Sequence, residues 1–184
     1  MNKMSKIRID LLKTLWRIGE PAYLKDIVKE SKLNVRRINM HLLNLRKRGY
    51  VRRSSEGFYS LTDLGKEALG FPKINGNLAK KILNRVSPKE AFHFYSEVGK
   101  PLMVSSDSLE DFCEKIGNID LKTLEFHSSR GDFERWIRFL GDVELAERLK
   151  LIRKSKLSGE DLREKLRETV RLRCQDLRRI ASSA

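Results

Sequence analysis

The sequence is poor in cysteine and contains no long apolar run. Cys113 and Cys174 are far apart and form no CxxC pair, so neither a disulfide framework nor a zinc knuckle is indicated. No apolar stretch approaches the ~20 residues that a membrane span requires. The first residues, MNKMSKIRID, also lack the apolar segment of a signal peptide. We therefore expect a cytoplasmic protein that makes no contact with a membrane.

The usual signatures of catalysis are missing as well. The chain has no glycine-rich phosphate loop, no HExxH and no Ser-His-Asp order. Its three histidines, His41, His93 and His127, are too scattered to indicate a metal site. The sequence therefore predicts a protein that is not an enzyme and that carries no cofactor or metal.

Positive charge is abundant and unevenly placed. The 184 residues include 39 Lys and Arg against 25 Asp and Glu, a net charge of +14 with a pI near 10.0. Residues 1–70 hold 16 basic residues against 7 acidic ones, whereas the remaining 114 residues hold 23 against 18. An excess of this kind favours a polyanionic partner, and its position assigns that partner to the first third of the chain.

Hydrophobic periodicity divides this first third into helices followed by strands. Gly19 and Pro21 end the first helix, Asn34 is a favourable N-cap for the third, and Gly49 ends it. The pattern then changes to that of a short hairpin. The expected elements are helices over 6–18, 24–31 and 34–48, strands over 50–53 and 58–61, and a brief helix after Thr62.

Part of this segment resembles known regulators. The residues that carry the resemblance are Ile38, His41-Leu42, Leu45 and Gly49-Tyr50-Val51, followed by Tyr59-Ser60-Leu61-Thr62 and Gly65. Residues 5–70 are thereby similar to prokaryotic and archaeal winged helix-turn-helix transcriptional regulators of the MarR, ArsR and PadR kind. The resemblance implies that residues 34–48 form a recognition helix for the major groove of DNA and that residues 50–61 form the wing.

Residues 35–53 carry the candidate DNA-binding surface. Along a helix, Val35, Ile38, Leu42 and Leu45 share one stripe, which we expect to be buried. No acidic residue occurs from 34 to 55, although a solvated helix normally interleaves acids with its bases. An ordinary solvated surface is the alternative. The residues expected to contact bases or phosphates are Arg36, Arg37, Asn39, Met40, Asn44, Lys47, Arg48, Arg52 and Arg53.

After a linker at 71–77, residues 78–184 predict a helix-rich α+β domain that dimerises the protein or senses a signal. The capping-box pattern Ser87–Glu90 favours a helix start, but residues 91–106 alternate and are rich in β-forming residues, so we expect a hairpin or short strands there. The whole chain is thus expected to be mainly α with small β elements. Helices are expected over 78–86, 108–116, 120–128, 132–140, 142–153 and 159–180.

A second resemblance covers residues 91–180. His127, Asp132-Phe133, Trp136 and Gly141-Asp142 are shared with an uncharacterised archaeal and bacterial domain family, which implies no activity. We expect His127 to be a cation at a helix C-terminus and Asp132 to cap the next helix, with Trp136 in the core. The alternative is that His127 and Asp132 form an oriented base in a ligand pocket.

The final helix has an apolar stripe of Leu162, Leu166, Val170, Cys174 and Leu177, which belongs to the core or pairs with a second copy of the chain. Its other face is expected to be solvated, with a contact of its basic end to phosphate as the alternative. It comprises Arg163, Arg167, Arg171, Arg173, Arg178 and Arg179.

The leading hypothesis is a sequence-specific, double-stranded DNA-binding transcriptional regulator that acts as a homodimer, with a small molecule or a protein as effector. A protein–protein adaptor that uses the winged helix as a scaffold is the second hypothesis. RNA binding is weaker, because few aromatic residues interleave with the basic ones.

Overall fold

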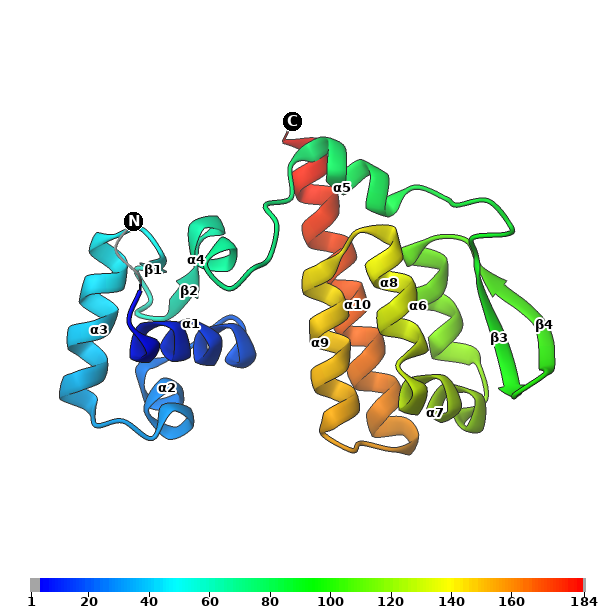
Figure 1. Cartoon of the computed structure of the whole chain (residues 1–184), viewed down its shortest axis with the longest axis horizontal. Coiled ribbons are helices and arrows are strands. Elements are labelled where there is room, and N and C mark those ends of the chain that lie inside the picture. Colours follow the sequence, from blue (N-terminus) through cyan, green and yellow to red (C-terminus); the bar gives the residue numbers. More distant parts are fainter. Residues whose placement is uncertain (1–3, 184) are drawn as a thin grey trace. The chain divides into compact units, whose positions relative to one another are not determined.

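The computed structural model describes residues 4–183 and is mainly helical, with two small antiparallel sheets (Figure 1). This agrees with the expected composition of a mainly α chain with small β elements. The chain forms two compact units that divide between Lys73 and Ile74. Among the described residues, no helix has both the length and the apolar character needed to cross a bilayer.

Over residues 4–73, the first unit contains four helices and one hairpin. These are α1 (Lys6–Ile18), α2 (Leu24–Ser31), α3 (Val35–Lys47), β1 (Val51–Arg53), β2 (Tyr59–Leu61) and α4 (Asp63–Glu67). Helix α1 contacts α2, β2 and α4, while α3 contacts α2 and β1. The predicted elements are therefore present in the predicted order, with boundaries that agree within a few residues.

Local sequence signals position α3. The side chain of Asn34 accepts a hydrogen bond of 2.9 Å from the backbone N–H of Arg37, as the predicted N-cap requires. Lys32 adopts the left-handed conformation between α2 and α3, which makes the turn tight. Ile38, Leu42 and Leu45 are almost completely buried, so the helix is fixed by one apolar stripe and leaves its opposite face to solvent.

The hairpin β1–β2 is anchored to the body of the first unit. Val51 pairs with Leu61 and Arg53 with Tyr59 in antiparallel register. The N–H of Tyr59 also donates a bond of 2.8 Å to the carbonyl oxygen of Ala22, which adds a bridge on the other edge of β2. The strands consequently have little freedom to move relative to α1 and α2.

The segment expected as a linker is shorter than 71–77. The ring of Phe71 is buried and lies 4.9 Å from that of Trp16, so this residue packs in the first unit. Asn75 accepts a hydrogen bond of 2.9 Å from the N–H of Leu78 and caps α5 (Gly76–Leu83), which begins and ends earlier than predicted. Phe71 is apolar and Asn75 is a good cap, and these local properties outweigh the breaker signal of Pro72.

The second unit is built around its last helix. Its other elements are β3 (Phe92–Glu97), β4 (Lys100–Ser106), α6 (Leu109–Asn118), α7 (Leu121–Arg130), α8 (Asp132–Leu140) and α9 (Val143–Lys154). The last helix, α10 (Gly159–Ser182), contacts α5, α6, α7 and α9 (Figure 1). One continuous core fills the space between these elements.

Residues 92–106 form the expected hairpin. Strands β3 and β4 pair antiparallel from Phe92–Ser106 to Glu97–Lys100, with two irregularities in register. The capping-box contacts between Ser87 and Glu90 form, but they close a turn and not a helix. Phe92 and Phe94 are buried while His93 is exposed, so the alternation of the segment decides its structure.

The apolar stripe of α10 is core. Leu162, Leu166, Val170, Cys174 and Leu177 are all at most 5% exposed in the single chain, so this stripe is not free to pair with a second copy.

The expectation that Arg173 lies on the solvated face of α10 is wrong. Its Nε and one terminal nitrogen contact the two oxygens of Asp142 at 2.6 and 2.9 Å, and the other terminal nitrogen lies 3.4 Å from Glu144. Asp142 is fully buried and also accepts the N–H of Leu145 as the cap of α9. The guanidinium is drawn inside because a buried carboxylate requires a cation.

Candidate functional site

The exposed face of α3 carries most of the side chains predicted to contact DNA. Arg36, Arg37 and Asn39 are exposed in the first turns, and Lys47 and Arg48 are exposed at the end. At 100° per residue, Arg36, Met40 and Lys47 lie opposite Ile38, while Arg37 and Asn39 lie on the two sides between these faces. An α-helix with its side chains is about 10–12 Å across, which matches the width of about 12 Å of the major groove of DNA.

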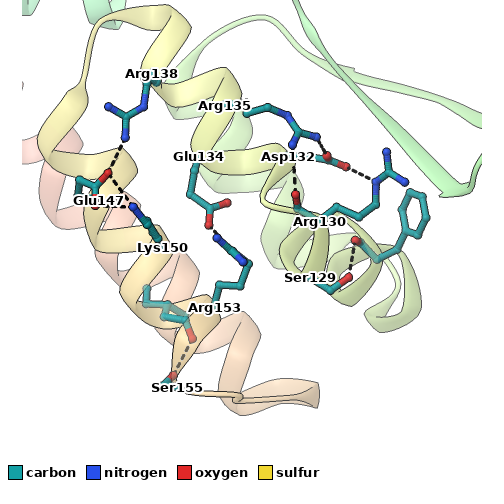
Figure 2. A network of polar contacts seen from close by, with 12 residues as sticks. Ser129, Arg130, Asp132, Glu134, Arg135, Arg138, Glu147, Lys150, Arg153 and Ser155 are labelled. Carbon is teal, nitrogen blue, oxygen red and sulfur yellow. Dashed lines mark hydrogen bonds and ion pairs between the residues drawn. The ribbon is translucent and has the colours of Figure 1, made fainter.

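The basic side chains of α3 are not neutralised. Arg36, Arg37, Lys47 and Arg48 make no ion pair with any residue within 4–183. In the second unit, by contrast, arginines are repeatedly paired with carboxylates, as in Arg138–Glu147 and Arg153–Glu134 on α8 and α9 (Figure 2). Unpaired charges at a rigid surface retain their attraction for an external anion.

Two arginines extend this surface onto the hairpin. Nε of Arg52 donates a hydrogen bond of 2.7 Å to the hydroxyl of Ser60 on the neighbouring strand. The guanidinium of Arg53 lies over the ring of Tyr59, 5.5 Å from its centre. Arg52 also has an acidic neighbour, since Glu20 lies 3.8 Å away. Both arginines are therefore oriented by the hairpin, but only Arg53 is free of a carboxylate among the described residues.

The pKa of His41, on α3, is affected by neighbouring positive charges. Its side chain is half-buried, at the edge of the apolar stripe. Burial lowers the pKa of His41, and the charges of Arg8 and Arg37 lower it further. A neutral imidazole in this position is consistent with a packing role, and it shows that Arg8 adds a cation from α1 to those of α3.

One prediction about α3 needs correction. Val35 was expected in the buried stripe but is 48% exposed, because it is the first residue of the helix and no earlier turn of α3 covers it. The side chain of Asn44 is half-buried, and its Oδ1 is shielded from solvent without a hydrogen-bond partner in residues 4–183. Its contact with bases stays a prediction. Leu43 also lies on the exposed side of α3 and is 50% exposed.

A second polar site lies in the other unit, around His127. The ring is 3% exposed and is enclosed by aromatic side chains, among them Phe92 and Phe94. The backbone N–H of Tyr95 donates a hydrogen bond of 2.8 Å to Nε2. On the opposite side of the ring, Nδ1 lies 2.8 Å from Oδ2 of Asp132. Both ring nitrogens are thus in hydrogen bonds within the protein.

These bonds fix the protonation of His127. A backbone N–H can only donate, so Nε2 is unprotonated, and the proton on Nδ1 is donated to Asp132. Burial lowers the pKa of His127, although Asp132 opposes this shift. The expected imidazolium at a helix C-terminus is therefore wrong. A neutral ring that uses both nitrogens internally also has no lone pair to offer as a general base.

Asp132 has a different position from the one expected. The residue before α8, Gly131, adopts the left-handed conformation and takes the N-cap position, so Asp132 is the first residue of the helix and does not cap it. Its carboxylate instead accepts hydrogen bonds from Arg130, whose Nε lies 3.2 Å away, and from Arg135 (Figure 2). Trp136 is in the core, as predicted, and its indole N–H donates to the carbonyl oxygen of Glu90 at 2.9 Å.

The polar cluster borders a pocket of about 360 Å³ that is open to solvent. Residues from the hairpin and from α7 and α8 line it, including Tyr95, Phe126, Arg130 and Trp136. Our interpretation of the sequence had missed Tyr95 and Arg130. The aromatic alternation of residues 92–95 was the available signal, but it does not indicate which helix the hairpin meets.

Two further kinds of group can be judged within residues 4–183, namely thiols and metal ligands. Burial raises the pKa of Cys174 to about 12 and also raises that of Cys113, so neither thiol is activated as a nucleophile. Within residues 4–183, no cluster of three or more His, Cys, Asp or Glu could hold a metal ion.

The chain matches no family model, no curated protein and no solved structure. The two resemblances drawn from the sequence therefore stay predictions, and the function has to be argued from the two sites themselves.

Proposed function

We propose that the chain is a sequence-specific, double-stranded DNA-binding transcriptional regulator of the winged helix-turn-helix kind. Helix α3 would enter the major groove and the hairpin β1–β2 would contact the backbone as the wing. The observation that carries the proposal is the solvent-facing, acid-free surface of α3, whose arginines and lysine are unpaired among the described residues.

The side chains of this surface suit two kinds of contact. Arg36, Arg37 and Asn39 are in the first turns, where side chains of a recognition helix reach the edges of bases, and Met40 offers an apolar contact for a thymine methyl group. Lys47, Arg48 and Arg53 are nearer the hairpin, where contacts to phosphates provide affinity without reading the sequence. Arg52 would add a weaker phosphate contact, because Glu20 is close to it.

The decisive experiment is a titration of labelled duplexes, selected from a random pool, with the Arg36→Ala and Arg37→Ala variants. We expect each variant to lose about 1–3 kcal/mol of binding free energy where the arginine contacts a base, or about one unit of salt slope where it contacts a phosphate. Arg171→Ala is the matched control, since it removes one arginine of the second unit that is paired with Glu168. If both variants bind like the wild type at every salt concentration, α3 is not the recognition helix.

A protein–protein adaptor is the second candidate, and one observation favours it. Met40 and Leu43 are 58% and 50% exposed on the same face of α3, and exposed apolar side chains beside polar ones are typical of protein interfaces. An adaptor would bind its partner with little dependence on salt and would lose that binding in Leu43→Ser. A regulator would keep most of its affinity for DNA in the same variant.

Twofold symmetric binding to DNA would require a homodimer. Because the apolar stripe of α10 is buried in the single chain, a dimer would have to use another surface. The mass of the protein in solution, measured by sedimentation with and without duplex, tests this part of the proposal. A cytoplasmic location is the one in which such a regulator would act.

A further inference from the structure

The pocket beside His127 is open to solvent and is large enough to accommodate part of a small molecule. Its volume of about 360 Å³ lies at the lower end of the range of small-molecule sites, which is roughly 300–1,000 Å³. Tyr95, Phe126 and Trp136 contribute to its lining, together with the small residue Ala91. Walls of this kind favour a flat apolar body.

Arg130 gives the pocket a directed positive charge. Its Nε donates to Asp132 and its guanidinium lies over the ring of Phe126, 5.0 Å from the centre, so the group is held in one orientation. Its two terminal nitrogens make no hydrogen bond with any residue that the structure describes, and they point away from Asp132 (Figure 2). A planar fork of N–H donors is suited to a carboxylate.

The acidic groups at the pocket are already neutralised. Asp132 accepts hydrogen bonds from His127, Arg130 and Arg135, and Glu97 is paired with Lys100. Among the residues that line the pocket, Arg130 is a cation and Glu97 and Asp132 are anions, and each carboxylate has at least one cationic partner. Among the described residues the terminal N–H donors of Arg130 have no partner, and such donors favour an anionic acceptor.

His127 forms part of the lining without being available for chemistry. Both of its ring nitrogens are occupied by Tyr95 and Asp132, as described above. The bonds instead hold the hairpin, α7 and α8 together beside the pocket. The arrangement is that of a preformed binding site.

We propose that this pocket binds a small aromatic carboxylate, with the aromatic body against Tyr95, Phe126 and Trp136 and the carboxylate on the terminal nitrogens of Arg130. This binding activity goes beyond the proposed recognition of DNA and does not depend on it, because every residue involved belongs to the second unit. Its failure would leave the assignment of α3 untouched.

The first test uses two probes of the same shape. The full-length protein is titrated by calorimetry with 1-naphthoate and with its neutral analogue 1-naphthamide. A charge-assisted hydrogen bond contributes about 1.5–3 kcal/mol, so 1-naphthoate should bind at least about tenfold more tightly than the amide. Equal affinities for the two probes, or no binding of either, would overturn the proposal.

Variants then locate the site. Arg130→Gln should weaken the binding of 1-naphthoate about tenfold and leave 1-naphthamide almost unchanged, whereas Arg130→Lys should retain part of the preference for the anion. Ala91→Trp should abolish the binding of both probes, because it fills the pocket without altering a charge. Arg138→Gln is the matched control, since this arginine is paired with Glu147 outside the pocket lining.

Each variant is first checked for its melting temperature. If Arg130→Gln does not fold, the comparison between the two probes on the wild type and the Ala91→Trp variant still decide the question. Unchanged binding in a folded Ala91→Trp variant would show that the probe binds elsewhere and would refute the site.

Discussion

The backbone N–H of Tyr95 donates a hydrogen bond of 2.8 Å to Nε2 of His127, across 32 positions of sequence. This bond ties the hairpin β3–β4 to α7, and Asp132 on α8 completes the arrangement from the other side of the ring. The imidazole is therefore a neutral connector of three elements. Its protonation would break the bond to Tyr95 and leave a charge in an aromatic environment.

A pH dependence of stability follows from this site. Burial holds the pKa of His127 below its ordinary value of 6.5 in the folded protein, so the unfolded chain binds the proton more strongly. The contribution of His127 to the free energy of unfolding is fully present above pH 6.5. It is lost as the pH falls through the pKa that His127 has in the folded protein. We expect the free energy of unfolding, from urea titrations between about pH 7.5 and about pH 5, to fall less in His127→Gln than in the wild type.

The variant His41→Gln is the necessary comparison for that experiment. Burial and neighbouring arginines also lower the pKa of His41, so this residue contributes a pH dependence of the same sign in the first unit. Identical pH profiles for the wild type and His127→Gln would mean that His127 does not titrate as its environment requires.

The buried pair of Arg173 and Asp142 should be sensitive to the removal of one partner. Arg173→Leu leaves the carboxylate of Asp142 fully buried without its cation, and we expect a loss of about 3–5 kcal/mol in stability, measured by urea unfolding. Arg171→Ala, which removes an exposed pair with Glu168, should leave the stability almost unchanged. Similar losses in the two variants would contradict the structural role of Arg173.

Gly65 is required by the close approach of α4 to the start of the hairpin. A Cβ at this position would lie 2.2 Å from the carbonyl oxygen of Tyr50 and 3.2 Å from a methyl carbon of Leu61. Since backbone cannot yield easily, Gly65→Ala should destabilise the first unit by about 1–3 kcal/mol, measured as a lower melting temperature. Gly117→Ala in α6 is the contrast, because the nearest atoms there belong to the flexible side chain of Arg167. Its effect should be small.

The proposed interface with DNA predicts that some variants lose affinity for all duplexes, whereas others lose specificity for one sequence. Arg53→Ala should weaken all duplexes to the same extent and reduce the salt slope by about one, as expected for a phosphate contact. Asn39→Ala should instead reduce the preference between sites that differ at one adenine, by about 1–3 kcal/mol, and leave the salt slope unchanged. Competition titrations at several salt concentrations distinguish the two. If Asn39→Ala weakened binding to all duplexes equally, Asn39 would not contribute to sequence specificity.

Much of the fold could be predicted because its signals are local. Asn34, Thr62, Ser108 and Asp120 each accept a hydrogen bond from the backbone three residues later, and each had been recognisable as an N-cap from its position before a periodic segment. The same holds for the buried stripe of α10, in which apolar residues recur at helical spacing.

The buried polar contacts of the second unit could not be predicted in this way. Periodicity placed Arg173 on the outside, but the buried Asp142 thirty-one positions earlier determines where its guanidinium lies. The tautomer of His127 likewise depends on Tyr95, which comes from another element. Polar groups are buried only where distant partners meet them, and one sequence does not indicate which partners meet.

The contacts of α10 have a consequence for the order of events during synthesis. This helix packs against α5, the first element of the second unit, and supplies much of the core between them. On a ribosome, residues 74–158 would therefore expose their apolar surfaces until residue 182 has left the exit tunnel, whereas the first unit could already be folded. A chaperone that binds nascent chains is therefore expected to bind the second unit and not the first.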